Sequence, residues 1–518
     1  MCGFLVSVDE TTVHEKFEQA FAAIAHRGPD MDRIQRSGNA WFGFHRLSIM
    51  DTSDSGMQPF HRGSRMLVCN GEIYNFEALK SRVSTTYQSS SDCEVLLPLY
   101  ETFATSMFAM LDAEYALVIY DEEKEQVIAA RDQIGIRPLF YGKSATGIGF
   151  ASEAKALIGL YDEVMPFPPG HYYVNGEFVD YRTIYGSKPM ITDEAAALAT
   201  IHDNLIAAVE KRLMSDVRVG FLLSGGLDSS LVCAIAAQRS KTPIDTFAIG
   251  MAHDAIDLKY ARQVAEKIGS NHHEVIMDDD DVIQALKPVI SMLETWDITT
   301  IRASIGMYML CRYIHEKTDI KVLLTGEISD ELFGYKYTDF APSAQAFQDE
   351  SLKRLRELYM YDVLRADRCV AAWSLEARVP FGDLTFVEDV LRIDPALKMN
   401  RHGIGKYLLR QAFADDDLLP ESILWREKAA FSDAVGHSMV DILKDYAREQ
   451  NVEVSEKLSY HCRPISAESA LYRCCFEADY QGYAAWIADY WMPNKTWPNC
   501  NVDDPSARVL SNYGLSGV

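Results

Sequence analysis

The stretch Val219-Gly220-Phe221-Leu222-Leu223-Ser224-Gly225-Gly226-Leu227-Asp228-Ser229-Ser230 decides the fold of the larger part of the chain. An apolar strand-like segment runs into a glycine-rich turn, and a helical pattern follows. This layout presents backbone N–H groups to phosphate at the start of a helix. It is neither a Walker A loop, which ends in Gly-Lys-Ser/Thr, nor a GxGxxG turn. A tight strand–helix connection with a capping serine is the plainer alternative.

Strand and helix patterns alternate from this stretch onward. The alternation is typical of a parallel sheet covered by helices, and beyond Phe340 the pattern becomes largely helical. The predicted strands are Val217 to Leu223, Ile244 to Ile249, His273 to Met277 and Ile320 to Leu324. The predicted helices are Ser229 to Gln238 and Leu258 to Ile268.

The first third of the chain has a different organisation. Short segments rich in β-branched and aromatic residues mix with helical patterns without regular alternation, which favours an α+β layered domain. A linker is predicted at 186–189, and Thr192-Asp193 could cap the helix after it. The predicted strands here are Phe4 to Val8, Arg65 to Cys69, Tyr115 to Tyr120 and Gln126 to Ala130, and the helices are Val13 to Ala25 and Asp92 to Phe103.

Composition excludes several classes of protein. The chain has 518 residues, 48% of them hydrophobic and 24% charged, as in globular proteins of two or more domains. Its formal net charge of −25 argues against a general binder of nucleic acids or anionic membranes, although a local nucleotide site stays possible.

The cysteines and the apolar stretches indicate the compartment. The ten cysteines form no CxxC pair and no zinc-ligand spacing, so we expect reduced thiols in a cytoplasmic protein. No apolar stretch is long enough to span a bilayer, and the N-terminus lacks the basic and long apolar regions of a secretory signal.

Cys2 is a candidate nucleophile. Removal of Met1 would leave Cys2 with a free α-amino group, whose ordinary pKa near 8 lets it accept the thiol proton around neutral pH. Taken alone, an inert cysteine at the start of a strand is the better interpretation. Five further motifs follow it in order: His26-Arg27-Gly28-Pro29-Asp30, His45-Arg46-Leu47-Ser48-Ile49, Asn70-Gly71-Glu72-Ile73-Tyr74-Asn75, Ser91-Asp92-Cys93-Glu94 and Arg131-Asp132-Gln133-Ile134-Gly135-Ile136-Arg137-Pro138-Leu139.

Together these motifs resemble the glutaminase domain of N-terminal-nucleophile (class II) glutamine amidotransferases, which implies an αββα layered fold. The resemblance implies that Cys2 attacks the glutamine side chain and that Asn70 and Gly71 form the oxyanion hole. Such a donor contributes roughly 3–4 kcal/mol. The remaining glutamine-binding residues implied are Arg46, which would pair the α-carboxylate, Glu72 and Asp92 at the α-ammonium, and Arg27, which would organise the site.

The segment Ser224–Ser230 resembles the pyrophosphate-binding loop of ATP pyrophosphatases. The similarity extends to glutamine-dependent asparagine synthetase of the bacterial kind, through about Val435. It implies a glutaminase domain over 2–186, a synthetase domain over 193–500 and a C-terminal tail over 501–518. The further segments that carry it are Thr295 to Ser304, Thr325 to Glu331, Ser374 to Phe381 and Trp425 to Lys428.

The family implies a role for each of these positions. Asp228 and Asp330 would hold Mg²⁺ on ATP, Glu327 would lie where the acyl-adenylate forms, and Lys428 would stabilise charge on the phosphorus or the departing pyrophosphate. Glu376 and Arg378 would support the site. The remaining ATP-binding residues implied are Leu223, Ser224, Gly225, Gly226, Ser229, Ile249 and Gly326, and the aspartate-binding residues are Thr299, Thr300 and Arg302.

One loop departs from the family pattern, which usually reads Ser-Gly-Glu-Gly-Ser-Asp-Glu. Here Thr325 replaces the serine, Ile328 replaces the second glycine, and Tyr335 stands where a further glycine is usual. A β-branched residue strongly disfavours positive φ. Either the backbone tolerates isoleucine, or the acceptor pocket is remodelled.

Three hypotheses follow. The first is amidation of aspartate with glutamine nitrogen, with ammonia passing through an internal tunnel and ATP cleaved to AMP and pyrophosphate. The second is a glutamine-dependent amide ligase with another carboxylic acid acceptor. The third is a low-activity regulatory homologue that senses glutamine or nucleotide. The family also implies a homodimer, and neither nucleic acid nor membrane is expected as a partner.

Overall fold

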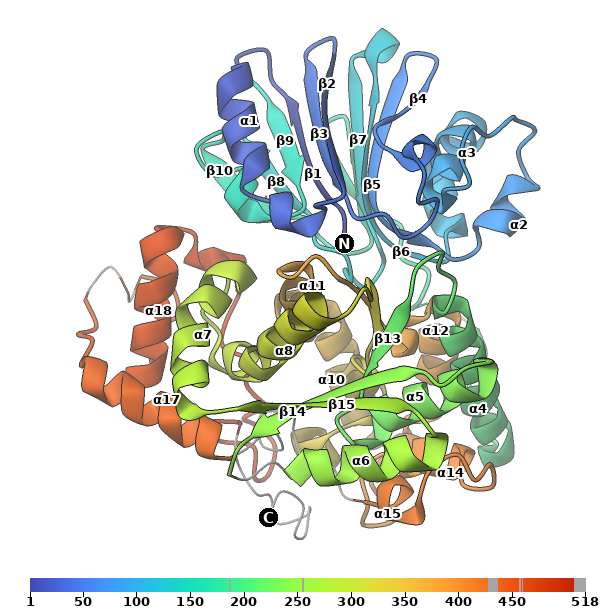
Figure 1. The fold of residues 1–518 in the computed structure, drawn as a ribbon, viewed down its shortest axis with the longest axis vertical. Helices are drawn as coiled ribbons and strands as arrows, with labels where there is room; N and C mark the ends of the chain where they lie inside the picture. The colour runs from blue at the N-terminus through green and yellow to red at the C-terminus, as the bar shows by residue number, and fades with distance from the viewer. Residues whose placement is uncertain (186–187, 254–255, 427–436, 456–457, 459, 507–518) are drawn as a thin grey trace. The chain divides into compact units, whose positions relative to one another are not determined.

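The computed structural model describes residues 1–185, 188–253, 256–426, 437–455, 458 and 460–506. Within it the chain forms two compact units (Figure 1). The first unit comprises Met1–Tyr185 with the short segments Met214–Arg218 and Val370–Glu376. The second comprises Gly186–Leu213, Val219–Cys369 and Ala377–Val518.

The first unit contains two six-stranded sheets whose paired strands run antiparallel. One has the order β10-β8-β9-β1-β3-β2 and the other the order β12-β11-β7-β6-β5-β4. The strands of the first are β1 (Gly3–Val8), β2 (Met31–Ser37), β3 (Ala40–Arg46), β8 (Phe140–Lys143), β9 (Ile148–Ala151) and β10 (Glu163–Pro166). Those of the second are β4 (Phe60–Arg62), β5 (Arg65–Ile73), β6 (Ala113–Asp121), β7 (Gln126–Arg131), β11 (His171–Val174) and β12 (Glu177–Asp180).

Strand β5 shows why the two sheets stack. Met66 and Val68 point into a core shared with β1 and β3, whereas Leu67 and Cys69 point into a second core. Successive side chains of a strand face opposite sides, so both faces of this strand are buried. The second core contains α2 (Phe76–Lys80) and α3 (Leu96–Phe103).

The outer face of the other sheet is covered by α1 (His14–Ala22). Phe21 of this helix stacks on His45 with ring centroids 3.7 Å apart, and a Cβ at Gly43 would lie 2.6 Å from the Phe21 ring. Helices therefore cover both outer faces of the stacked sheets, and the predicted αββα arrangement is confirmed.

The second unit is built on a sheet with the order β15-β14-β13-β16-β17. Pairing is parallel between β13 and β14, β13 and β16, and β14 and β15. The predicted α/β class is confirmed here as well. Its strands are β13 (Val219–Leu222), β14 (Asp245–Met251), β15 (Asn271–Met277), β16 (Val322–Leu324) and β17 (Glu376–Arg378).

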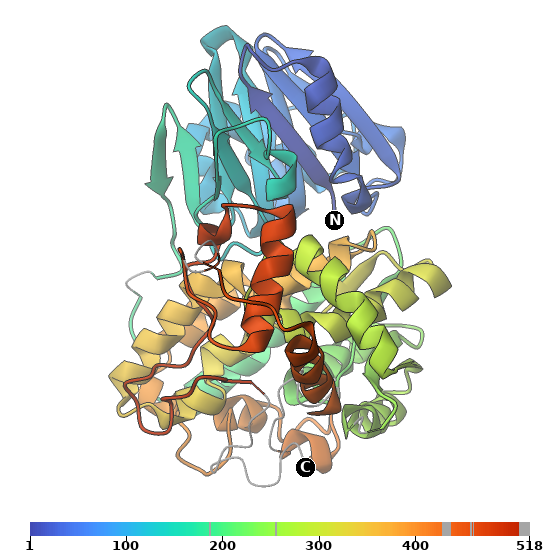
Figure 2. The same ribbon diagram turned by 90° about the vertical axis from the view of Figure 1, so that its left-hand side faces the viewer.

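Helices surround this sheet and form most of the chain beyond it. Asp193 caps the first of them by accepting a hydrogen bond from the Ala196 amide at 2.8 Å, as predicted. Helices α17 and α18, orange to red in Figures 1 and 2, pack against α7. The helices are α4 (Glu194–Arg212), α5 (Leu227–Arg239), α6 (Ile256–Ile268), α7 (Asp279–Leu293), α8 (Ile298–Lys317), α9 (Ser329–Phe333), α10 (Ala344–Glu357), α11 (Asp362–Ala371), α12 (Leu384–Arg392), α13 (Pro395–Lys398), α14 (Tyr407–Ala412), α15 (Glu421–Leu424), α17 (His437–Gln450) and α18 (Ala467–Asp479).

Some predicted elements differ in extent. The helix expected over Asp92 to Phe103 begins as a 3₁₀ turn, Asp92–Val95, and becomes α-helical only at Leu96. The hairpin of β2 and β3 was not predicted, and neither were the short strands β8 to β12. Among the described residues, no helix has the length and apolar character needed to cross a membrane.

Candidate functional site

A pocket lies at the carboxyl ends of β13 and β16. The sheet order reverses between these strands, since β14 and β15 extend to one side of β13 and β16 to the other. Open parallel sheets bind ligands at such switch points. The pocket is lined by the loop after β13, the loop after β16, the start of α8 and the C-terminal segment near Trp491.

The loop after β13 has the geometry of an anion cradle. Gly225 adopts φ +73°, and a Cβ there would lie 2.5 Å from the Ala261 amide nitrogen, so only glycine fits. Gly226 is the N-cap of α5. The Ser229 hydroxyl accepts a hydrogen bond from the Ser224 amide at 3.2 Å and lies 3.0 Å from the Ser224 hydroxyl. Two hydroxyls and the first amides of a 13-residue helix thus converge on one point.

The loop after β16 approaches this cradle closely. A Cβ on Gly326 would lie 2.9 Å from the Ser229 amide nitrogen, which explains the glycine. The backbone amide of Thr325 donates to the Arg378 carbonyl at 3.1 Å, so β17 supports this loop. Arg378 is fully buried and also donates to the Arg212 carbonyl at 3.0 Å.

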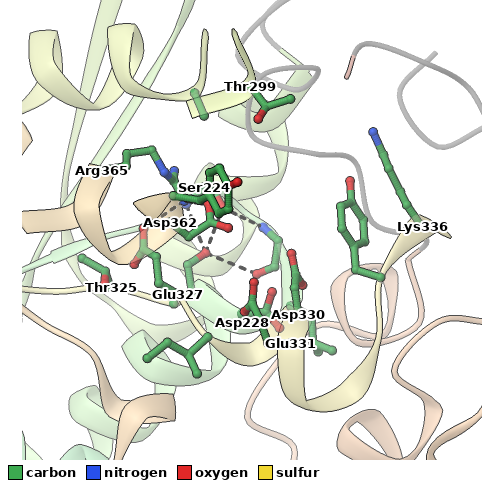
Figure 3. Close-up of a pocket in the computed structure, with 18 of the residues that line it drawn as sticks. Ser224, Asp228, Thr299, Thr325, Glu327, Asp330, Glu331, Lys336, Asp362 and Arg365 are labelled. Atoms are coloured by element: carbon green, nitrogen blue, oxygen red, sulfur yellow. Dashed lines mark hydrogen bonds and ion pairs between the residues drawn. The ribbon is translucent and has the colours of Figure 1, made fainter. Parts of the chain in front are cut away.

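The two predicted metal-binding carboxylates meet at a lysine. Lys406 Nζ donates to Asp228 Oδ1 at 2.7 Å and to Ser329 Oγ at 2.9 Å, and it forms an ion pair with Asp330 Oδ1 (Figure 3 labels Asp228 and Asp330). The Ser329 hydroxyl itself donates to Asp228 at 2.7 Å. The Lys406 ammonium thus contacts both carboxylates, which shows that they face a common point.

This carboxylate pair fits Mg²⁺. The described residues hold no cluster of three or more His, Cys, Asp or Glu suited to a metal ion. Mg²⁺ needs no such cluster, because it usually binds one or two carboxylates together with substrate phosphates. Beside the pair, burial and the neighbouring charges of Asp362 and Asp330 raise the pKa of Glu331 to about 8.

Glu327 lies on the same wall of the pocket. Its carboxylate is 3.6 Å from Arg365 of α11, and Arg365 also binds Asp362 at 2.9 Å (Figure 3). Glu327 Oε2 and Thr325 Oγ1 are buried atoms without a hydrogen-bond partner within the described part of the chain. Unpaired buried polar atoms at a pocket wall are suited to a polar ligand.

The start of α8 forms another wall. Thr299 and Thr300 line the pocket, and the hydroxyls of both donate to Asp297, at 2.6 Å and 2.8 Å. The structure does not bring Arg302 to this wall. Its guanidinium is 1% exposed and pairs with Glu468 and Asp504. At about 100° per residue, position 302 lies about 110° around the helix from the stripe that faces the pocket.

The remaining predicted positions of this pocket fall into two groups. Leu223 and Ile249 are buried at the ends of β13 and β14 and line the pocket. Lys428 lies outside the described residues. Its neighbour Arg426 lines the pocket, with its guanidinium 3.6 Å from the centroid of the Tyr260 ring.

Ile328 adopts the left-handed backbone that its sequence context indicates for glycine. Its φ is +79° and its ψ −20°, and its side chain is 1% exposed while lining the pocket. The structure thus places isoleucine in a backbone conformation that disfavours it, and both alternatives raised by the sequence stay predictions. The loop keeps a glycine-like conformation, with an isoleucine side chain added to the pocket wall.

The second predicted site lies in the first unit, around Cys2. The Cys2 thiol is 3.6 Å from the Leu47 carbonyl, and burial raises its pKa to about 11. The Met1 ammonium donates to the Leu375 carbonyl at 2.8 Å, and burial lowers its pKa to about 5. The Met1 ammonium in this environment therefore loses its proton more readily than an exposed α-amine.

Asn70 and Gly71 lie on β5, which packs against β1, the strand that follows Cys2. Both polar atoms of the Asn70 side chain are buried and have no hydrogen-bond partner among the described residues. A Cβ at Gly71 would lie 2.3 Å from the Glu114 carbonyl, so the close pairing of β5 with β6 requires glycine. An unpaired amide beside an exposed backbone edge suits an oxyanion.

The residues expected at the glutamine head group are all buried. Arg46 donates to the Ser53 carbonyl at 2.6 Å and also binds the Asp51 carbonyl. Asp92 accepts from the Ile73 amide at 2.7 Å, which ties it to the end of β5, where Glu72 is also buried.

Arg27, which was predicted to organise this site, contacts the backbone of the candidate nucleophile. It donates to the Cys2 carbonyl at 2.9 Å and to Glu153 at 2.8 Å. Glu376 was predicted to support the synthetase site, but it belongs to the first unit, where it lies 3.8 Å from Arg137, whose side chain is fully buried.

Lys406, Arg365 and the C-terminal segment were missed by the sequence reasoning. No local motif marks them, because each reaches the pocket from a distant element. The only available signal for Lys406 was a lysine after Gly403 and Gly405, which is weak.

Comparisons with known proteins define the class first. A model of the glutamine amidotransferase domain matches residues 1–173, and a model of asparagine synthase matches residues 200–347 and 339–492. A solved glutamine phosphoribosylpyrophosphate amidotransferase from B. subtilis aligns with a TM-score of 0.33 and 14% identity over 54% of this chain and 91% of that one, which is too low to add to the argument. The chain combines a glutamine amidotransferase domain with an ATP-site domain of the asparagine synthase type.

Relatives over nearly the full length then give the family. The chain is 43% identical to glutamine-hydrolysing asparagine synthetase of Cricetulus griseus over 540 residues, covering 95% of each sequence. It is 43% identical to that of Gallus gallus and 42% to that of Homo sapiens, with the same coverage. The chain belongs to the family of glutamine-hydrolysing asparagine synthetases.

Proposed function

We propose that this protein is a ligase that makes asparagine from aspartate, ATP and glutamine. Glutamine is hydrolysed to ammonia in the first unit, and aspartate is adenylated in the second with release of pyrophosphate. Ammonia that travels through an internal tunnel then gives asparagine and AMP. The observation that carries this proposal is the convergence of the phosphate cradle, the pair Asp228 and Asp330, and Glu327 at one end of the parallel sheet.

The glutaminase step requires a deprotonated thiol. A buried thiol with a pKa of about 11 is almost entirely protonated at pH 7, so a base must take its proton. Once Met1 is removed, the α-amine of Cys2 serves as that base, because its ordinary pKa near 8 lets it accept the thiol proton. The thiolate attacks the glutamine side-chain carbonyl, and the tetrahedral intermediate expels ammonia, which takes the proton from the α-ammonium, to leave a glutamyl thioester. Water then hydrolyses the thioester to glutamate and frees the Cys2 thiol.

The oxyanion and the head group are held by buried polar groups. Asn70 offers its unpaired side-chain amide and Gly71 its backbone N–H to the oxyanion. Arg46 binds the α-carboxylate. To do so, its guanidinium gives up its hydrogen bonds to the Ser53 and Met50 carbonyls. Asp92 and Glu72 hold the α-ammonium.

In the synthetase site, the loops after β13 and β16 bind ATP. Ser224, Gly225, Gly226, Ser229 and Gly326 cradle the phosphates. Leu223 and Ile249 pack on the adenine. Asp228 and Asp330 would hold Mg²⁺, which supplies positive charge to the triphosphate when bound. Lys406 contacts both carboxylates and holds them together.

The acceptor is assigned to the wall that carries Thr299 and Thr300. Glu327, paired with Arg365, faces the position of the adenylate. Lys428 is proposed as the cation on the departing pyrophosphate. Arg302 acts on this wall through α8 rather than by touching aspartate, since its guanidinium is held by Glu468 and Asp504.

A second candidate function is favoured by Ile328. Its buried side chain occupies space in the pocket where the family pattern has a glycine, so the pocket could accept a different carboxylic acid.

A homodimer and a cytoplasmic location remain our predictions. Sedimentation of the purified protein tests the homodimer.

The deciding experiment measures AMP and pyrophosphate release from Mg²⁺-ATP and ammonium, with and without aspartate. We expect AMP that depends on aspartate, accompanied by asparagine in equal amount. If the protein hydrolyses glutamine but does not respond to aspartate, the second function replaces the first. If glutamine and ATP bind without any turnover, the protein is a regulatory homologue.

A further inference from the structure

The C-terminal segment forms part of the synthetase pocket. Its residues Trp491, Pro493, Asn494, Trp497, Pro505 and Ser506 line the same pocket as the phosphate cradle. The Tyr337 hydroxyl, from the loop after α9, donates to the Pro505 carbonyl at 2.9 Å. Cys500 and Val502 are buried against Tyr337 in a small apolar cluster. The segment is therefore packed in place and is not a loose tail.

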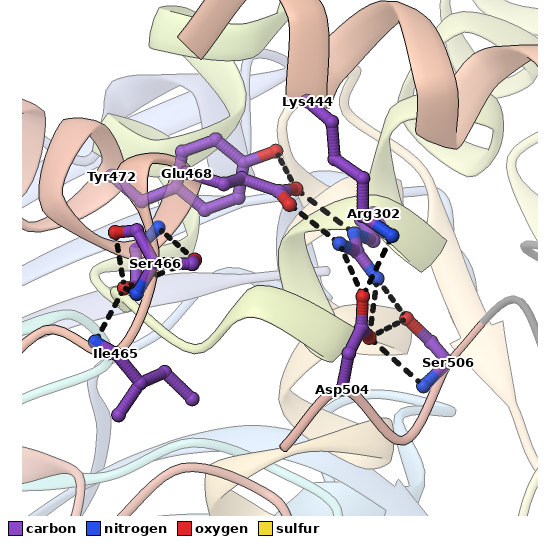
Figure 4. A network of polar contacts seen from close by, with 9 residues as sticks. Arg302, Lys444, Ile465, Ser466, Glu468, Tyr472, Asp504 and Ser506 are labelled. Atoms are coloured by element: carbon purple, nitrogen blue, oxygen red, sulfur yellow. Dashed lines mark hydrogen bonds and ion pairs between the residues drawn. The ribbon is translucent and has the colours of Figure 1, made fainter. Parts of the chain in front are cut away.

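Asp504 ties this segment to α8. Its carboxylate accepts two hydrogen bonds from Arg302, at 2.9 Å and 3.2 Å (Figure 4). It also pairs with Lys444 of α17 at 2.8 Å, and Arg302 binds the Ser506 hydroxyl. On its other edge Arg302 is held by Glu468 of α18, at 2.9 Å. One arginine thus joins α8, α18 and the C-terminal segment.

The charge state of this contact is secure. Burial alone would raise the pKa of Asp504, but the hydrogen bonds and charges of Arg302 and Lys444 outweigh it and lower the pKa to about 2. The same carboxylates raise the pKa of Arg302 beyond its already high ordinary value. Both shifts favour the charged forms of this pair.

We propose that Asp504 is a positioning residue for the synthetase reaction, which fastens residues 502–506 as a wall of the acceptor pocket through Arg302 and Lys444. This inference rests on the proposed function of that pocket. Helix α8 carries both the pocket wall and the arginine that holds Asp504. Thr299 and Thr300 line the pocket, and Arg302 follows them by three and two residues on the same helix. Loss of the tie frees Pro505 and Ser506 from the wall and loosens the grip on the substrates.

The test compares Asp504→Asn with Asp503→Asn. Asp503 is the adjacent residue with the same side chain, but it is fully exposed, and its one ion pair within the described part of the chain is with Lys495 at 3.9 Å. With ammonium as the nitrogen source, we expect Asp504→Asn to raise the KM for aspartate about tenfold. The loss of one hydrogen bond between charged groups corresponds to about a tenfold change in an equilibrium constant. Asp503→Asn should leave this KM unchanged, and neither variant should change glutamine hydrolysis.

Two more variants separate positioning from simple structural damage. Asp504→Glu keeps the negative charge, so its KM for aspartate should lie close to that of the wild type. Lys444 does not line the pocket, so Lys444→Met can raise the KM only through Asp504, and its effect should not add to that of Asp504→Asn. An unchanged or lowered KM in Asp504→Asn overturns the proposal, and a lowered KM would mean that Asp504 competes with substrate for Arg302.

A binding readout keeps the inference separate from the proposed function. Hydrogen–deuterium exchange of the peptide containing 502–506 needs no turnover. We expect Mg²⁺-ATP to slow this exchange in the wild type and in Asp503→Asn, but much less in Asp504→Asn. Equal protection in all three proteins contradicts the tie, even if the wild type makes no asparagine. Protection without aspartate-dependent AMP contradicts only the proposed function.

Discussion

At the scale of single residues, Ile328 shows a conflict between backbone and side chain. A left-handed backbone costs an L-residue roughly 1–2 kcal/mol, and β-branching makes this conformation rarer still. Deleting a buried isoleucine side chain to alanine costs about 2–5 kcal/mol. The burial of Ile328 thus outweighs its strain, which explains how the loop retains a glycine-like φ of +79° without glycine.

This balance predicts that glycine is more stable than alanine at position 328, which is the opposite of their order in a helix. In a right-handed helix, glycine is less stable than alanine by about 1 kcal/mol. At position 328 both substitutions remove the buried side chain, but only glycine relieves the positive φ. We expect Ile328→Gly to be more stable than Ile328→Ala by about 1 kcal/mol, as measured by their thermal unfolding midpoints. The opposite order would show that the loop relaxes to negative φ once the isoleucine is gone.

At the scale of elements, the sequence predicted what is local and missed what is assembled. The strand, turn and helix around Ser224–Ser230 could be predicted because apolar runs and glycines act on neighbouring residues. Lys406 could not, because it lies 178 residues from Asp228 along the chain and no pattern links them. The family resemblance placed Arg302 at the acceptor together with Thr299 and Thr300, whereas the turn of α8 directs its side chain to Glu468 and Asp504.

The hairpin of β2 and β3 was missed for a related reason. Strand β2 is only partly buried, so its sequence shows no strong alternation, and pairing with β3 defines it. The C-terminal segment was left without order, since its contacts with Tyr337 and Arg302 come from distant elements.

Lys406, at the start of α14, connects α5 to α9 through Asp228 and Asp330. Lys406→Met removes an ammonium that contacts both carboxylates, so the repulsion between them increases. We expect the thermal midpoint to fall, and Mg²⁺ to raise the midpoint of this variant more than that of the wild type, because the metal replaces the lost charge. Lys353→Met is the control, since its side chain is half exposed on α10. Equal responses to Mg²⁺ would mean that the metal does not bind this carboxylate pair.

At the scale of the whole molecule, the two sites are built by separate units, and each has its own core. The residues around Cys2 belong to the sheets of the first unit, whereas the nucleotide pocket is lined entirely by residues of the second. Damage confined to one site should therefore leave the chemistry of the other intact. In the proposed mechanism the first unit supplies only ammonia to the second, and added ammonium can replace it.

Cys2→Ala tests this separation. The variant loses the nucleophile, so we expect glutamine-dependent asparagine synthesis and glutamine hydrolysis to disappear, while synthesis from ammonium stays within about twofold of the wild type. Cys474→Ala is the matched control, because this thiol is exposed on α18 and takes part in neither site. Both activities should survive in the control. If Cys2→Ala lost synthesis from both nitrogen sources while its thermal midpoint stayed unchanged, the two sites would not be separable, and the division of labour proposed for the two units would be wrong.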